Sequence, residues 1–115
     1  MKNARRHQRV ATPPMMRVTD TITGKDAGRL GNLSPEGLML VADGPIADGA
    51  LHQFAFDLPD QYGRLQPVEV GVREVWKAPG TMHGQYWVGF RFISLGAADE
   101  GVLRDWLGGV EMRLG

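Results

Sequence analysis

Three arginines near the amino terminus are the residues of this chain best suited to hold an anion. They stand in the run Arg5-Arg6-His7-Gln8-Arg9, which is followed by Pro13-Pro14. A guanidinium is planar, forks two hydrogen bonds onto a phosphate and can lie flat on a purine ring. The cluster therefore suits a ligand that carries both phosphates and bases. Its plainer interpretation is a solvated basic tail.

A second candidate is the polar segment Asn32-Leu33-Ser34-Pro35-Glu36-Gly37, which lies between predicted strands. Asn32 and Ser34 supply an amide and a hydroxyl that can both point out of one turn. Gly37 permits either a positive φ or a close backbone approach. An ordinary Asx-type turn uses the same residues, so the segment taken alone fits a structural turn as well as a binding loop.

Catalytic and metal chemistry have little support. Ser34 lacks the glycine two positions earlier that a nucleophile elbow requires. His7, His52 and His83 show no ligand spacing, and without cysteine there is no thiolate ligand or nucleophile. We therefore expect no enzyme, no catalytic residue, no metal and no cofactor.

The charge of the chain is unevenly distributed. Its 115 residues contain 13 basic and 13 acidic side chains, which is a balanced total for one small domain. The first 19 residues hold five of the basic side chains and no acid, so a +5 arm precedes a −5 body. No apolar run approaches the roughly 18 residues of a membrane helix, and the basic start lacks a secretory apolar core. We expect a cytoplasmic protein without membrane insertion.

Apolar alternation predicts several strands. The clearest is 66–76, with Val68, Val70, Val72 and Trp76 on one face, and 85–94 alternates in the same way. Further strands are expected at 16–22, closed by a turn at 23–26, at 54–58 and at 38–40.

One segment has a helical period. Its apolar side chains fall on a single stripe: Val102, Leu103, Trp106, Leu107 and Val110. The helix is expected from about 98 to 108, ended by Gly108-Gly109. Trp87 lies opposite the core face of its strand, and we expect the helix to cover it with Trp106 nearby, the alternative being an exposed partner or stacking surface. Five or six strands followed by one helix indicate an antiparallel barrel or sandwich capped by that helix.

Together, the two polar segments resemble the PilZ domain, the bacterial receptor module for cyclic di-GMP (c-di-GMP). Arg5-Arg6-His7-Gln8-Arg9 matches its RxxxR motif and Asn32-Leu33-Ser34-Pro35-Glu36-Gly37 its (D/N)xSxxG motif. The strand ending in Trp76, the 88–92 segment and the terminal helix are also similar to that family, so the resemblance covers nearly the whole chain. It implies a six-stranded antiparallel β-barrel over 15–115 with a C-terminal helix, preceded by a flexible basic arm over 1–14.

The resemblance also implies roles for individual residues. Arg5 and Arg9 would contact the phosphates and guanine faces of c-di-GMP, while Asn32 and Ser34 meet a guanine edge or a phosphate, and Gly37 lets the turn approach the ligand. Arg6 is either an auxiliary contact or a solvent-facing neighbour. The arm is expected to be mobile in the free protein and to fold over the barrel when ligand binds. The rearranged surface would then dock on an effector protein, which makes the chain a stand-alone receptor or adaptor.

Two alternatives remain at this stage. A PilZ-like adaptor could act by constitutive protein contact without sensing nucleotide. A small β-barrel could instead bind nucleic acid through the basic arm, which requires aromatic side chains on an exposed strand face. Tyr86, Phe90 and Phe92 fall on the expected core face and the body is acidic, so no DNA or RNA partner is expected. The number of bound nucleotides and the oligomeric state stay open.

Overall fold

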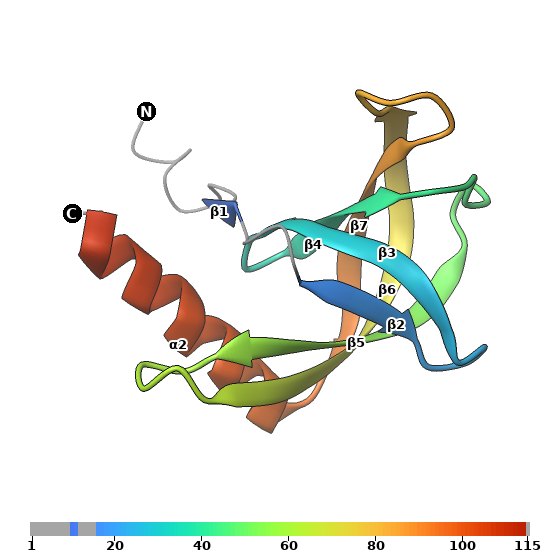
Figure 1. The fold of residues 1–115 in the computed structure, drawn as a ribbon. Helices are drawn as coiled ribbons and strands as arrows, with labels where there is room; N and C mark the ends of the chain where they lie inside the picture. Colours follow the sequence, from blue (N-terminus) through green and yellow to red (C-terminus); the bar gives the residue numbers. More distant parts are fainter. Residues whose placement is uncertain (1–9, 12–15, 115) are drawn as a thin grey trace.

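The computed structural model describes residues 10–11 and 16–114, with side chains over 16–108. In chain order the elements are β1 (Val10–Ala11), β2 (Arg17–Asp20), β3 (Lys25–Leu33), β4 (Gly37–Ala42), β5 (Leu51–Pro59), β6 (Leu65–Pro79), β7 (Tyr86–Leu95) and helix α2 (Ala97–Leu114) (Figure 1).

The sheet closes into a barrel. Its order is β1-β3-β2-β5-β6-β7-β4, and an additional pairing of β3 with β4 joins the two ends. Every pair is antiparallel. Six strands, β2 to β7, form the closed wall, and the short β1 lies beside the end of β3. The expected six-stranded antiparallel barrel with a C-terminal helix is therefore confirmed.

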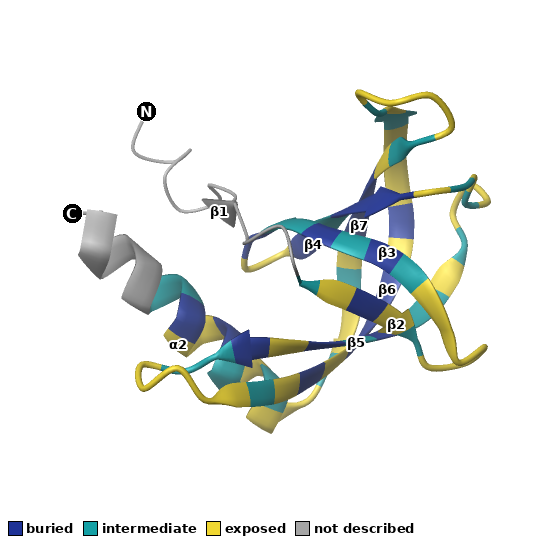
Figure 2. Cartoon of the chain, viewed as in Figure 1, coloured by how far each residue is buried: buried dark blue, intermediate teal, exposed yellow. Residues whose placement is uncertain are grey.

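The core lies inside this wall and draws side chains from all the long strands. Figure 2 shows buried residues alternating with more exposed ones along these strands. Phe54 packs edge-on against Phe90, with their ring centroids 4.9 Å apart. The predicted alternation holds along β5, along most of β6 and along β7. Its fully or almost fully buried members are Phe54, Phe56, Leu58, Val68, Val70, Val72, Val88 and Phe90.

The alternation fails at Trp76, which was expected in the core and is 40% exposed. The register of β6 against β7 shifts between Glu74, opposite Phe90, and Trp76, opposite Gly89. The additional residue of this bulge leaves Glu74 on the inside, where it is 5% exposed, and turns Trp76 to the outer face. A bulge leaves no period-two signal in the sequence, so simple alternation places Trp76 on the wrong face.

The first hairpin also differs from the expectation. The strand expected at 16–22 is confined to β2, and Ile22 lies in the turn after it, 73% exposed. The nine-residue β3 follows, a strand that the apolar pattern does not predict. Its only large buried side chains are Leu30 and Leu33, and a register shift between Leu30 and Asn32 interrupts the alternation.

Helix α2 packs against β5 and β6 at one end of the barrel (Figure 1). Leu103 and Trp106 are buried there, and Val102 and Leu107 pack against the same core, as the predicted stripe requires. The helix continues to Leu114 instead of ending at Gly108-Gly109. Gly108 does not have the positive φ of a terminating glycine, so it remains an interior helix residue. Across the described residues, no helix has the length and apolar character needed to cross a bilayer.

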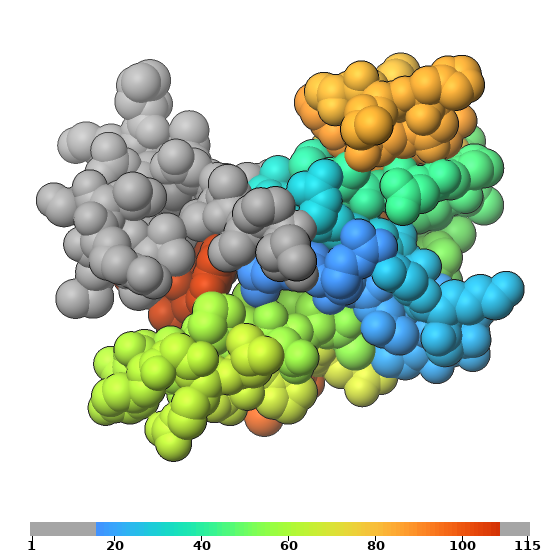
Figure 3. Space-filling model, viewed as in Figure 1, coloured from blue at the N-terminus to red at the C-terminus, as the bar shows by residue number. Residues whose placement is uncertain are grey.

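Trp87 is not covered as expected. It lies on the outer face of β7, paired with Val41 of β4 and Ala78 of β6, and is 37% exposed. Because α2 seals the end of the barrel at β5 and β6, its Trp106 belongs to the core. The hairpin joining β6 to β7 projects from the body of the barrel (Figure 3).

Candidate functional site

Ser34 is the structural centre of the loop between β3 and β4. Its side chain is 2% exposed, and its Oγ accepts hydrogen bonds from the backbone N–H groups of Glu36 and Gly37, both at 3.3 Å. The hydroxyl donates to the carbonyl oxygen of Gly37, also at 3.3 Å, and the Ser34 N–H donates to the same oxygen at 2.9 Å. One donor and two acceptor positions are the full capacity of a hydroxyl, so the loop uses all of it.

Asn32 is placed differently from Ser34. It lies half-buried on β3, and its Nδ2 donates to Sδ of Met39 at 3.6 Å. Met39 is its cross-strand partner on β4. The expectation that the amide and the hydroxyl both point out of one turn is therefore wrong, because the Asn32 side chain lies over β4 while the Ser34 hydroxyl turns into the loop.

Gly37 is required by close packing and not by its φ, which is not positive. It pairs with Arg91 of β7, and a Cβ at this position would overlap the carbonyl oxygen of Phe90. The same Cβ would lie 3.0 Å from the Phe90 carbonyl carbon and 3.1 Å from Cα of Arg91. Of the two expected reasons for glycine, close backbone approach is the one observed, and the approaching backbone is that of β7.

Strand β1 connects the two sequence motifs. Val10 pairs with Leu33 and Ala11 with Asn32, so the chain directly after Arg9 is hydrogen-bonded to the strand that carries Asn32. The expected ligand residues Arg5, Arg6 and Arg9 lie outside the described residues, as does the arm over 1–9 and 12–15.

Trp76 is a residue of this face that sequence reasoning assigns to the core. Asn32, Met39, Gly89 and Trp76 are successive cross-strand partners on β3, β4, β7 and β6. A Cβ on Gly89 would overlap the indole of Trp76, which therefore lies over the strand at the glycine. The pattern of β6 alone gives no signal of this position, because the pairing of Trp76 with Gly89 follows from the shifted register of β6 against β7. The indole of Trp76 thus gives this face a half-exposed aromatic plane over β7, which is two strands away from the β3 strand of Asn32.

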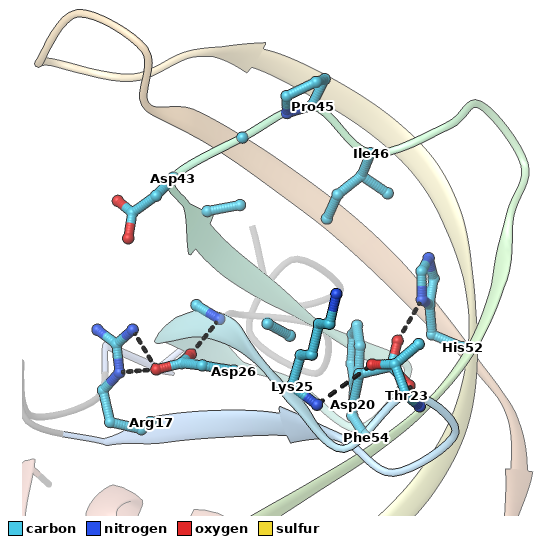
Figure 4. Close-up of a pocket in the computed structure, with 14 residues that line it drawn as sticks. Arg17, Asp20, Thr23, Lys25, Asp26, Asp43, Pro45, Ile46, His52 and Phe54 are labelled. Carbon is cyan, nitrogen blue, oxygen red and sulfur yellow. Dashed lines mark hydrogen bonds and ion pairs between the residues drawn. The ribbon is translucent and has the colours of Figure 1, made fainter.

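A separate pocket of about 390 Å³ lies between the β2–β3 hairpin and the loop that follows β4 (Figure 4). Its charged groups are largely paired with one another. Nε and Nη2 of Arg17 donate to Oδ2 of Asp26 at 3.0 and 2.6 Å, and Nδ1 of His52 donates to Oδ2 of Asp20 at 3.0 Å. The bonds from Arg17 lower the pKa of Asp26.

Burial by itself raises the pKa of Asp20, but hydrogen bonds from His52 and from the N–H groups of Ile22 and Thr23 outweigh it and lower the pKa. Neither sequence motif contributes to this pocket.

The three aromatic side chains expected on the core face do lie there, whereas Trp76 and Trp87 are exposed on outer strand faces. Phe90 is fully buried, and Tyr86 and Phe92 pack against the core. These three residues therefore do not supply the exposed stacking surface that barrel proteins use for single strands. Within the described part of the chain, no group of three or more potential metal ligands comes together.

Comparison with known structures gives the same fold. The structure of Bacillus subtilis inhibitor of motility (MotI/DgrA) superposes with a TM-score of 0.71 at 18% identity, covering 95% of this chain and 51% of that one. The crystal structure of Escherichia coli YcgR in complex with c-di-GMP superposes with a TM-score of 0.72 at 18% identity, covering 95% of this chain and 46% of that one. The chain thus spans about half the length of these two proteins.

The isolated PilZ domain of E. coli YcgR with c-di-GMP gives a TM-score of 0.66 at 15% identity, covering 95% of this chain and 92% of that one. No curated protein matches the chain. The family model described as "PilZ domain" matches residues 3–109, which include both motifs and every strand. The chain belongs to the PilZ domain family.

Proposed function

We propose that this chain is a receptor for c-di-GMP that signals to a protein partner and catalyses no reaction. The observation that supports this most directly is the pairing of β1 with β3, since it anchors the chain after Arg9 beside Asn32. A ligand held by both motifs would therefore bridge the basic arm and the barrel wall. The E. coli YcgR structures with c-di-GMP share the fold on which this arrangement rests.

The ligand carries two phosphate charges and two purines. An arginine can both hydrogen-bond a phosphate and stack on a purine. In the proposed complex Arg5 and Arg9 contact the phosphates and guanine faces, and Arg6 is either an auxiliary contact or a solvent-facing neighbour. A charge-assisted hydrogen bond contributes about 1.5 to 3 kcal/mol and arginine stacking about 0.5 to 2, so two arginines supply much of the roughly 8 kcal/mol of a micromolar complex.

On the barrel side, Asn32 meets a guanine edge or a phosphate with its amide. Ser34 stays in the proposed site, but in the described conformation its hydroxyl is fully used within the loop. Direct contact with the ligand would break one of these bonds, so its main contribution is to hold the loop in place. Gly37 keeps the loop against β7. Trp76 supplies an aromatic plane on the same face, available for stacking on a base.

The signal in this proposal is the ordering of the arm over the barrel when ligand joins the two motifs. The ordered surface then docks on an effector protein. The acidic body disfavours long polyanions while leaving a small dianion accessible to the basic arm.

Isothermal titration calorimetry with c-di-GMP tests the proposal. The wild-type protein should bind, and Arg9→Ala should weaken binding by about tenfold or more, the loss of one charge-assisted contact. Arg104→Ala, which removes the same charge from an exposed position on α2, is the matched control and should bind like the wild type. Absence of binding at about 100 μM nucleotide, well above the micromolar range, would support the non-sensing adaptor instead.

A further inference from the structure

Arg73 and Arg91 form a pair of like charges directly opposite each other on the outer wall of the barrel. They are cross-strand partners on β6 and β7, and both side chains are exposed. Directly opposed side chains on antiparallel strands have Cβ atoms about 4.5 to 5.5 Å apart. The two guanidinium groups therefore extend from neighbouring points of one face.

Within the described chain, neither guanidinium forms a salt bridge. Nη1 of Arg73 donates a long hydrogen bond, 3.4 Å, to the carbonyl oxygen of Gly49. Glu74, the acid next to Arg73 in the sequence, is turned inward and accepts from the Gly49 N–H at 2.7 Å. Two like charges directly opposite each other on a sheet destabilise it. An anion bound between them would offset this repulsion.

The arginine pair adjoins both parts of the proposed ligand face. Arg91 pairs with Gly37 on its other side, and so lies beside the motif loop. Gly89 lies two residues before Arg91 and therefore on the same face. The indole of Trp76 lies over this glycine. A flat aromatic ring on the same face as two guanidinium groups that have no acidic partner among the described residues matches the base and the phosphodiester of a nucleotide.

We propose that Arg73 and Arg91 bind a phosphodiester group of the nucleotide, as an anion site on the barrel wall independent of the arginines of the arm. This inference rests on the proposed function for the identity of the ligand, though not for the anion affinity of the pair. The wall then contributes charge as well as shape, and the ligand gains a fixed phosphate contact in addition to those of the arm.

Calorimetry with c-di-GMP on Arg91→Gln and Arg73→Gln tests the inference. Arg91→Gln should weaken binding by about tenfold or more. Arg104→Gln on α2 is the matched control for charge and should change affinity by no more than about twofold. Thermal unfolding without ligand should show Arg91→Gln at least as stable as the wild type, because the variant loses a like-charge repulsion. A wild type that binds and an Arg91→Gln protein that binds equally tightly would overturn the inference and leave the proposed function intact.

A second measurement keeps the inference testable if the wild type does not bind c-di-GMP, an outcome that would refute the proposed function alone. Inorganic pyrophosphate should raise the unfolding temperature of the wild type, and Arg73→Gln/Arg91→Gln should lose that increase while Arg104→Gln retains it. An equal increase in the double variant, or no increase in the wild type, would overturn the anion site.

Discussion

Ser34 and Gly37 show that residues of a binding motif can be required by the fold itself. The Ser34 hydroxyl forms three hydrogen bonds within its own loop, and Gly37 leaves no room for a Cβ beside Phe90. Asn32 lies half-buried on β3, and its Nδ2 donates to Sδ of Met39 on β4. At the scale of single residues, Ser34 and Gly37 build the loop, and Asn32 is the member of the motif that we propose to contact the ligand.

Gly37→Ala tests this division. The added Cβ would overlap the Phe90 carbonyl and should lower the free energy of unfolding by about 1 to 3 kcal/mol, the usual range for overpacking. Gly44→Ala is the control, because Gly44 has open space and no positive φ, and it should change stability by no more than about 1 kcal/mol. Chemical denaturation measures both. Equal stability of Gly37→Ala and the wild type would remove the packing explanation for this glycine.

At the scale of elements, the sequence predicts those strands whose alternation is uninterrupted. The valines of β6 and the aromatics of β5 and β7 are assigned correctly because one face is apolar over several pairs of residues. Trp76 is misassigned because the bulge after Glu74 reverses the face, and β3 is missed because a register shift and few large apolar residues hide its period. Bulges depend on pairing between strands, which a single strand's pattern does not record.

The candidate site, like the strands, is predicted only in part from the sequence. The two motifs locate the arm and the loop, and their order in the sequence is enough to relate them to a known family. The pairing of Arg73 with Arg91 and the position of Trp76 over Gly89 arise only when β6 and β7 come into register. These contributions from the barrel wall therefore need the folded arrangement.

The length of α2 gives a prediction at this scale. Gly101 and Gly108 are interior helix residues with open space where a Cβ would lie. Gly108→Ala should therefore stabilise the protein by about 0.5 to 1 kcal/mol, because alanine loses less backbone entropy in a helix. Gly101→Ala should act similarly, and thermal unfolding measures both. Destabilisation by Gly108→Ala alone would indicate a helix that ends at Gly108, in contradiction to the continuous α2.

At the scale of the whole molecule, the barrel has two polar regions, and they approach each other where Arg73 donates to Gly49 of the loop after β4. One face has the motif loop, the β1 anchor and the arginine pair, and the pocket with Asp20 and His52 lies between the β2–β3 hairpin and the loop after β4. Most charged groups of the pocket are already paired, whereas Arg73 and Arg91 have no acidic partner among the described residues. Charge is thus left unbalanced on the face that carries β1.

The most direct test of the central claim is a two-dimensional ¹H–¹⁵N NMR titration of the full chain with c-di-GMP, because it reports binding and position together. The proposed binding face predicts shifts of the backbone amides at 32–34, 36–37, 73–76 and 89–91, with much smaller changes around Asp20 and His52. An unchanged spectrum, or shifts confined to the pocket residues, would contradict it.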